Sequence, residues 1–230
     1  MWSSWSELKN SMNQQSHSNR LSFLSALWLW LEMAVIFVGG PLLYLFNLLP
    51  GHKSIPLLGV FTVGLIYLVA NKNFSKKKLG FNGFREWKEL LLKSLLVAIV
   101  LITITVIFEP QNLFILPHTN PLLWGLIIIF YPIWSALTQE LIYRPFFFSR
   151  YQRIIGSRRA ILLLNALLFA FLHIIFRNWI AIVGAFIAGL FWARNYQKNQ
   201  SWLAVTLEHA IWGNLLYTIG LGHYFYVPDF

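Results

Sequence analysis

The sequence contains no cysteine, and this absence excludes several kinds of chemistry. A chain without cysteine forms no disulfide, offers no thiolate to a metal ion and has no cysteine nucleophile. Charged residues are also scarce, at 11% of the chain, whereas an ordinary soluble domain carries about 25%. A soluble globular fold is therefore not expected.

Apolar side chains dominate instead. Of the 230 residues, 57% are hydrophobic, and the mean hydropathy is +0.60. A membrane-spanning helix needs about 20 predominantly apolar residues, and the runs that approach this length are residues 24–49, 55–71, 90–108, 122–143, 160–176, 179–194 and 202–220. Because a bilayer offers no partner to an open backbone, every span should be helical. We predict an all-α, polytopic transmembrane helix bundle of about seven spans, with six to eight compatible with the hydropathy.

The distribution of charge predicts how the spans are oriented. Residues 1–22 are polar and lack the features of a signal peptide, so we expect a cytoplasmic tail followed by a single transmembrane domain at 23–230. With the N-terminus inside, sixteen lysines and arginines lie on cytoplasmic segments and only Lys53 and Arg177 lie outside. This bias predicts a multi-pass integral membrane protein with its C-terminus on the opposite side. It also assigns the net charge of +10 to loops beside the lipid bilayer rather than to nucleic-acid binding.

Three polar sites interrupt the apolar runs. The first is Gln139-Glu140 with Arg144, the second is His173, and the third is His209 with the nearby Gly213 and Asn214. An ionisable side chain at membrane depth is costly unless it is paired or wetted, so each site is a functional hypothesis by default. Together they supply a carboxylate, two imidazoles, amides and a guanidinium, which are the groups of a hydrolytic site.

Helix geometry brings these sites to a similar depth. If two antiparallel helices turn near Gly156, Glu140 lies 16 residues before the turn and His173 lies 17 after it. At 1.5 Å per residue the two side chains come level. His209 lies seven residues past Trp202, about 10 Å inside the same face. Equal depth is necessary for a common site, but the rotation of each helix about its axis stays open.

Each residue has a catalytic and a structural interpretation. Glu140 and Arg144 have the spacing of an i,i+4 pair, so Glu140 is either a general base or half of a structural ion pair. His173 could orient a water, ligate a metal or simply bond a backbone carbonyl. His209 could stabilise an oxyanion or pack between helices. Gly213 shares its face, whereas Asn214 points about 140° away.

The order of these motifs resembles the CPBP family of intramembrane proteases, which comprises the type II CAAX prenyl endopeptidases and their bacterial Abi-like relatives. The resemblance rests on Gln139-Glu140-x-x-x-Arg144, Phe169-x-x-x-His173 and His209-x-x-x-Gly213 and covers about residues 120–220. It implies peptide-bond hydrolysis inside a membrane by a water that glutamate and histidine activate, with His209 as oxyanion donor.

Two positions depart from the family pattern. Gln139 stands where the family usually has its first glutamate, and an amide orients a water without taking its proton. Gly213 stands where asparagine is often found, with Asn214 one residue late. The resemblance therefore assigns the base to Glu140 together with His173, with Gln139 and Arg144 in support.

These observations predict an intramembrane endopeptidase in a bacterial cell membrane, acting on a membrane-embedded or prenylated peptide or protein. No cofactor should be required; a zinc ion bound by Glu140, His173 and His209 is the metal alternative. Two other functions stay open: a catalytically inactive relative that acts as a binding, immunity or scaffold protein, and a small transporter. No inverted repeat supports the transporter.

Overall fold

The computed structural model describes residues 23–48, 54–81 and 86–226. This part of the chain is helical and contains no strand. Its α-helices are α2 (Phe23–Ala34), α3 (Gly40–Leu45), α4 (Ser54–Ala70), α5 (Trp87–Phe108), α6 (Ile115–Thr119), α7 (Pro121–Tyr131), α8 (Leu137–Leu141), α9 (Phe147–Ile155), α10 (Arg158–Leu172), α11 (Trp179–Asn199) and α12 (Trp202–Ile219). The predicted cytoplasmic tail, residues 1–22, lies outside the described residues.

Short helical segments of other pitch connect or interrupt these helices. The wider π turns are η1 (Val35–Gly39), η4 (Pro132–Ala136) and η5 (Ile142–Phe146). The tighter 3₁₀ turns are η2 (Lys76–Leu79), η3 (Pro110–Asn112), η6 (His173–Phe176) and η7 (Gly222–Phe225). The π turns η4 and η5 both contain a proline, whose missing N–H removes one hydrogen bond of a regular α-helix.

The predicted helix bundle is confirmed. Within the described residues, five continuous helical stretches are long and apolar enough to cross a membrane: Phe23–Leu45, Trp87–Phe108, Pro121–Ile155, Arg158–Phe176 and Trp179–Asn199. The apolar α4 is somewhat shorter, and α12 is long enough but carries Glu208, His209 and Asn214 in its sequence. These seven helical segments correspond to the seven runs in the sequence.

The helix of the fourth span extends beyond the apolar run. The hydropathy places this span at residues 122–143, and the helical stretch runs on to Ile155. Pro145 lies inside the π turn η5, which accommodates it without ending the helix. The predicted turn at Gly156 is present, and this residue has a φ of +70°, a conformation that suits glycine.

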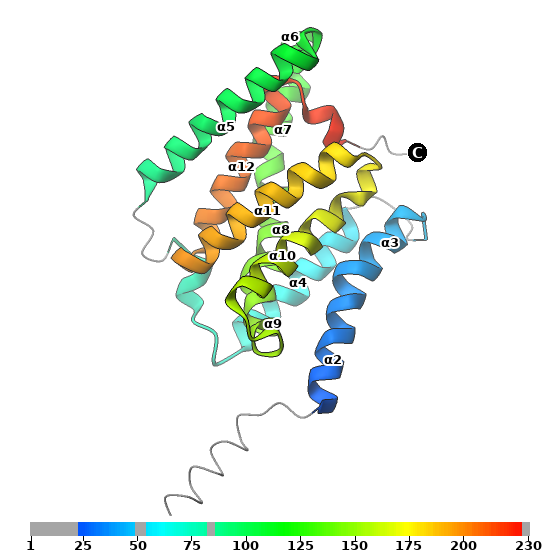
Figure 1. Cartoon of the computed structure of the whole chain (residues 1–230), viewed down its shortest axis with the longest axis vertical. Helices are drawn as coiled ribbons and strands as arrows, with labels where there is room; N and C mark the ends of the chain where they lie inside the picture. The colour runs from blue at the N-terminus through cyan, green and yellow to red at the C-terminus, as the bar shows by residue number, and fades with distance from the viewer. Residues whose placement is uncertain (1–22, 49–53, 82–85, 227–230) are drawn as a thin grey trace, which may run out of the picture.

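Capping residues define several helix ends. The side chains of Ser157, Asn178 and Ser201 accept a hydrogen bond from the third backbone N–H of α10, α11 and α12, respectively. Such caps satisfy donors that the first turn of a helix leaves unpaired. At its other end α12 closes with Gly220, which has a φ of +116°. These short turns bring α10, α11 and α12 into antiparallel contact, with α5 packed on α12 and α4 on α8 (Figure 1).

The core between α2, η5, α9 and α10 is aromatic. Phe37 makes edge-on contacts with Tyr143, Phe147 and Tyr151 at ring distances of 5.0–6.0 Å. Beside this cluster Glu32 binds Arg150 through two hydrogen bonds of 2.9 and 2.6 Å. The first helical stretch is thereby fixed against the stretch that contains Glu140.

Candidate active site

Glu140 lies at the centre of a buried polar group. Its Oε2 accepts a hydrogen bond of 2.8 Å from Nε of Arg144, and both side chains are fully buried. Arg144 also donates to the Oδ1 of Asn165 on α10, and the amide of Asn165 donates to the carbonyl of Tyr143 over 2.7 Å. The predicted i,i+4 pair therefore exists, and Asn165 holds its guanidinium in place.

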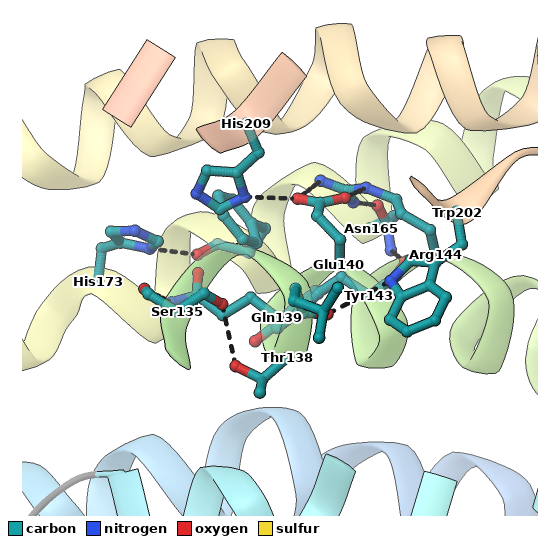
Figure 2. Close-up of polar contacts among 12 residues, drawn as sticks. Ser135, Thr138, Gln139, Glu140, Tyr143, Arg144, Asn165, His173, Trp202 and His209 are labelled. Carbon is teal, nitrogen blue, oxygen red and sulfur yellow. Dashed lines mark hydrogen bonds and ion pairs between the residues drawn. The ribbon is translucent and has the colours of Figure 1, made fainter. Parts of the chain in front are cut away.

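His209 reaches the same carboxylate from α12. Its Nδ1 lies 2.8 Å from the Oε1 of Glu140, as Figure 2 shows. Since a carboxylate accepts hydrogen bonds, Nδ1 carries the hydrogen, and the Nε2 lone pair is left available. The ring of Trp192 stacks on the imidazole at 3.9 Å and covers one of its faces. The contact between Glu140 and His209 agrees with their predicted common depth.

His173 lies close by but does not bond Glu140. It is the first residue of η6, directly after α10, and its Nδ1 lies 2.8 Å from the carbonyl oxygen of Phe169 (Figure 2). The ring of Phe169 contacts both imidazoles, with centroid distances of 4.8 Å to His173 and 5.9 Å to His209. The structure thus has the backbone hydrogen bond of the structural interpretation, while Nε2 of His173 forms no hydrogen bond with the described residues.

Gln139 and Asn214, which the sequence assigned supporting roles, bond elsewhere. The amide nitrogen of Gln139 donates to the hydroxyl of Ser135 over 2.8 Å, and its Oε1 is buried without a partner among the described residues. Asn214 donates to the carbonyl of Ile128 on α7 over 3.2 Å. This direction agrees with the predicted rotation of Asn214 away from His209.

Gly213, the other predicted supporting residue, lies against Tyr131 of α7. A Cβ atom at Gly213 would come within 2.2–2.3 Å of the Cε1, Cζ and hydroxyl atoms of the Tyr131 ring. Real Cβ atoms do not approach other atoms so closely, so the absence of a side chain at Gly213 is what admits this ring. The edge of Tyr131 also faces His209, with ring centroids 5.9 Å apart.

A cavity of about 520 Å³ opens beside this contact. Tyr131 and Tyr217 supply its hydroxyl groups, and the remaining lining is apolar: Leu58, Leu126, Ile127, Phe130 and Trp134. Leu126, Phe130 and Trp134 are each more than 40% exposed, so the cavity opens at the outer, lipid-facing surface of the bundle. An extended apolar segment of a substrate would fit such a lining.

The arrangement does not fit the metal alternative. Within the described ranges, no three histidine, aspartate or glutamate side chains are grouped so that they could hold a metal ion. The carboxylate of Glu140 is occupied by Arg144 and His209, and Nδ1 of His173 faces a backbone carbonyl. Glu140, His173 and His209 therefore do not form a ligand set in this arrangement.

Three residues at the site were missed by the sequence analysis: Asn165, Trp192 and Tyr131. A signal existed for Asn165, because an amide within an apolar run is unusual at membrane depth. Trp192 and Tyr131 carried no such signal. Aromatic side chains are frequent in this chain, at 17% of its residues, and only the packing of α7 and α11 against α12 distinguishes these two.

Comparison with known proteins finds a family match over the part of the chain that contains these residues. The family model for Type II CAAX prenyl endopeptidase Rce1-like proteins matches residues 119–215. The matched range contains Glu140, Arg144, His173 and His209, and it confirms the resemblance that the motifs indicated. No curated protein and no solved structure matches the chain.

Proposed function

We propose, from the membership of residues 119–215 in the Rce1-like type II CAAX prenyl endopeptidase family, that this chain is an intramembrane endopeptidase. Its substrate would be a membrane-associated or prenylated protein, in keeping with that family. The observation that carries the proposal is the 2.8 Å hydrogen bond between Nδ1 of His209 and Glu140. A buried carboxylate that orients an imidazole is a common arrangement for activating water.

In the proposed reaction Glu140 acts on the water through His209. Both oxygens of Glu140 are engaged, by Arg144 and His209, so we assign the proton transfer to Nε2 of His209. A water on Nε2 gives up a proton while its oxygen bonds to the carbonyl carbon of the substrate. The carbon–nitrogen bond then breaks, and His209 returns the proton to the departing amine.

His173 supplies a second imidazole. Since Nδ1 of His173 donates to the carbonyl of Phe169, its Nε2 is available to accept a hydrogen bond. Both rings contact Phe169, and we propose that His173 positions the attacking water beside His209. Arg144 keeps Glu140 charged and fixed, and Asn165 holds Arg144.

The test is cleavage of a pool of membrane peptides, including prenylated ones, by the purified protein in lipid. Mass spectrometry would identify the products. His209→Gln, Glu140→Gln and His173→Gln should each lower the rate, by about 10²–10⁴-fold where a general base is lost. His118→Gln is the matched control, because His118 is exposed and lies just before the matched range. Equal cleavage by all five proteins would contradict the proposal.

No metal is part of the proposal, and we expect cleavage to survive exhaustive chelation. Purified protein would be dialysed against a strong chelator and assayed with the same peptides, before and after zinc is added back. A loss of cleavage that added zinc restores would contradict this expectation.

A catalytically inactive relative that binds a membrane peptide is the second candidate. Gln139 favours it, because an amide stands at the family's first glutamate and the side-chain oxygen of this amide is buried without a partner among the described residues. The Gln139→Glu variant distinguishes the two. Cleavage gained from an inactive parent supports a binding protein on a protease scaffold, whereas cleavage lost from an active parent supports an enzyme adapted to glutamine.

A further inference from the structure

Tyr131 occupies the place that a side chain at Gly213 would take. Gly213 lies one turn after His209 on α12, so both face the same side. The hydroxyl of Tyr131 lies 2.3 Å from the position of a Cβ on Gly213. A hydroxyl group from α7 therefore stands where the resembled family often has an asparagine amide. In that family the asparagine lies on the same helix as the second histidine, which corresponds to His209 here.

The π turn η4 explains why Tyr131 faces this way. Nine residues separate Tyr131 from Glu140, and in a regular α-helix this spacing puts their side chains about 180° apart. A π turn adds one residue to the turn, which reduces the separation to roughly 80° at 100° per residue. With η4 between them, Tyr131 and Glu140 can therefore both approach His209 from the same helical stretch.

The hydroxyl of Tyr131 is free to bind a substrate. Among the described residues, no hydrogen bond to this hydroxyl is formed, although its ring contacts His209 and Tyr217 at 5.9 and 5.6 Å. The same side chain lines the 520 Å³ cavity. Tyr131 therefore contacts both the cavity and the ring of His209.

We propose that Tyr131 is a further catalytic residue, whose hydroxyl donates a hydrogen bond to the substrate carbonyl oxygen as it becomes an oxyanion. The inference rests on the proposed peptidase function. It also resolves a conflict of roles, because His209 acting as base through Nε2 has its other nitrogen bound to Glu140 and cannot serve as the donor. No proton leaves Tyr131; the bond strengthens as negative charge develops on the oxygen.

The first experiment compares Tyr131→Phe with Tyr224→Phe. The probe is a farnesylated peptide with a short C-terminal extension beyond the prenylated residue. Loss of one oxyanion donor should lower kcat by about 10²–10³-fold with little change in KM. Tyr224 is the matched control, because its variant also removes one tyrosine hydroxyl, which donates to Glu109 and not to the cavity that Tyr131 lines, and this variant should retain kcat.

A double variant tests whether a hydrogen-bond donor is needed at this position, whichever helix supplies it. Tyr131→Ala removes the ring that would collide with a side chain at Gly213, and Tyr131→Ala/Gly213→Asn then adds an amide donor on α12. We expect the double variant to recover at least 10-fold of the kcat that Tyr131→Ala loses, within the roughly 10²–10³-fold effect of one donor. A purely structural Tyr131 predicts that the second substitution lowers kcat further.

A binding measurement keeps the two proposals distinguishable. The probes are two farnesylated peptides in which the bond after the prenylated residue is replaced by a phosphinate, which mimics the oxyanion, or by a CH₂–CH₂ link. Tyr131→Phe should weaken phosphinate binding at least 10-fold and leave the other peptide unchanged. Comparing two ligands on one protein cancels any loss of folded material.

Cleavage and phosphinate binding together distinguish a failure of the Tyr131 role from a failure of the peptidase function. Cleavage by the parent with unchanged kcat in Tyr131→Phe overturns the role of Tyr131 and leaves the peptidase standing. Absence of cleavage, together with a phosphinate preference that Tyr131→Phe abolishes, supports the donor in a protein that does not turn over. Absence of both cleavage and phosphinate preference overturns the two proposals together.

Discussion

Arg144 makes it possible for Glu140 to be charged in a position with no access to solvent. An isolated carboxylate at this depth would be strongly unfavourable, and the guanidinium at 2.8 Å neutralises it. Arg144 is itself satisfied by Asn165 and lies over the ring of Phe169 at 5.3 Å. Arg144, Asn165 and Phe169 therefore together support the charge and the orientation of Glu140.

Removing Arg144 should be far more damaging than removing an exposed cation. Arg144→Met leaves the buried Glu140 without its partner, and we expect a loss of about 3–5 kcal/mol in unfolding free energy. Lys198 is the control, because it also pairs with two glutamates but is 54% exposed, and Lys198→Met should scarcely change the unfolding midpoint. Unfolding of the purified protein in detergent measures both.

A double variant checks the cause of this loss. In Glu140→Gln/Arg144→Met neither charge remains, so part of the lost stability should return relative to Arg144→Met alone. If the single and double variants unfold at the same midpoint, the unpaired carboxylate is not the reason for the loss.

Prediction from sequence succeeded at the residue scale where one helix carries both partners. The spacing of Glu140 and Arg144 is enough to pair them, and the 100° step per residue is enough to turn Asn214 away from His209. It failed where the partner comes from another helix. Which faces α7 and α10 turn toward their neighbours depends on packing, so the contact of Tyr131 with Gly213 and the pairing of Asn165 with Arg144 could not be found from their own segments.

At the scale of elements, hydropathy identified the helices but not their pitch. Long apolar runs are a direct consequence of the thickness of a bilayer, and all seven correspond to helical segments. The π turns η4 and η5 leave no such mark, because hydropathy measures the polarity of the side chains and not the pitch of the helix that carries them. They continue the helix through Pro145 to Ile155 and set the relative rotation of Tyr131 and Glu140.

Two helix-ending glycines make a matched pair for a prediction. Both Gly156 and Gly220 have a positive φ, so alanine at either position should cost about 1–3 kcal/mol in backbone strain. A Cβ at Gly156 meets open space, whereas one at Gly220 would lie 1.9 Å from the backbone oxygen of Asn112. Gly220→Ala must also displace η3, and we expect it to lower the unfolding midpoint more.

The unfolding midpoints of Gly156→Ala and Gly220→Ala, measured in detergent, test this expected order. The parent protein provides the reference, and the elution volume of each variant on a sizing column shows whether it stays monodisperse. A larger loss in Gly156→Ala would mean that the contact between Gly220 and Asn112 adds nothing to the stability of the α12 terminus.

At the scale of the whole molecule, segments predicted to lie on the same side of the membrane contact each other. Ser201 donates to the carbonyl of Gly80 over 2.8 Å, which joins two segments predicted to be cytoplasmic. At the other end Arg177 donates to the carbonyl of Leu45, and the backbone of Phe114 bonds that of Ile219. The alternation of ends along the chain, visible in Figure 1, therefore agrees with the partition by charge.

The direction of insertion follows from the same charges and gives a last prediction. The segment Lys72–Lys78 lies at the end that carries the basic excess, so it should face the cytoplasm, and Thr119 should face outward. The chain has no native cysteine, so Ser75→Cys and Thr119→Cys, both at exposed positions, can be labelled without background. In intact bacterial cells a membrane-impermeant maleimide should label Thr119→Cys alone, and permeabilised cells should show both. Labelling of Ser75→Cys alone in intact cells would contradict the predicted orientation. The end of α12 that bears Trp202 would then lie on the outer side of the membrane, and His209 would be closer to that side.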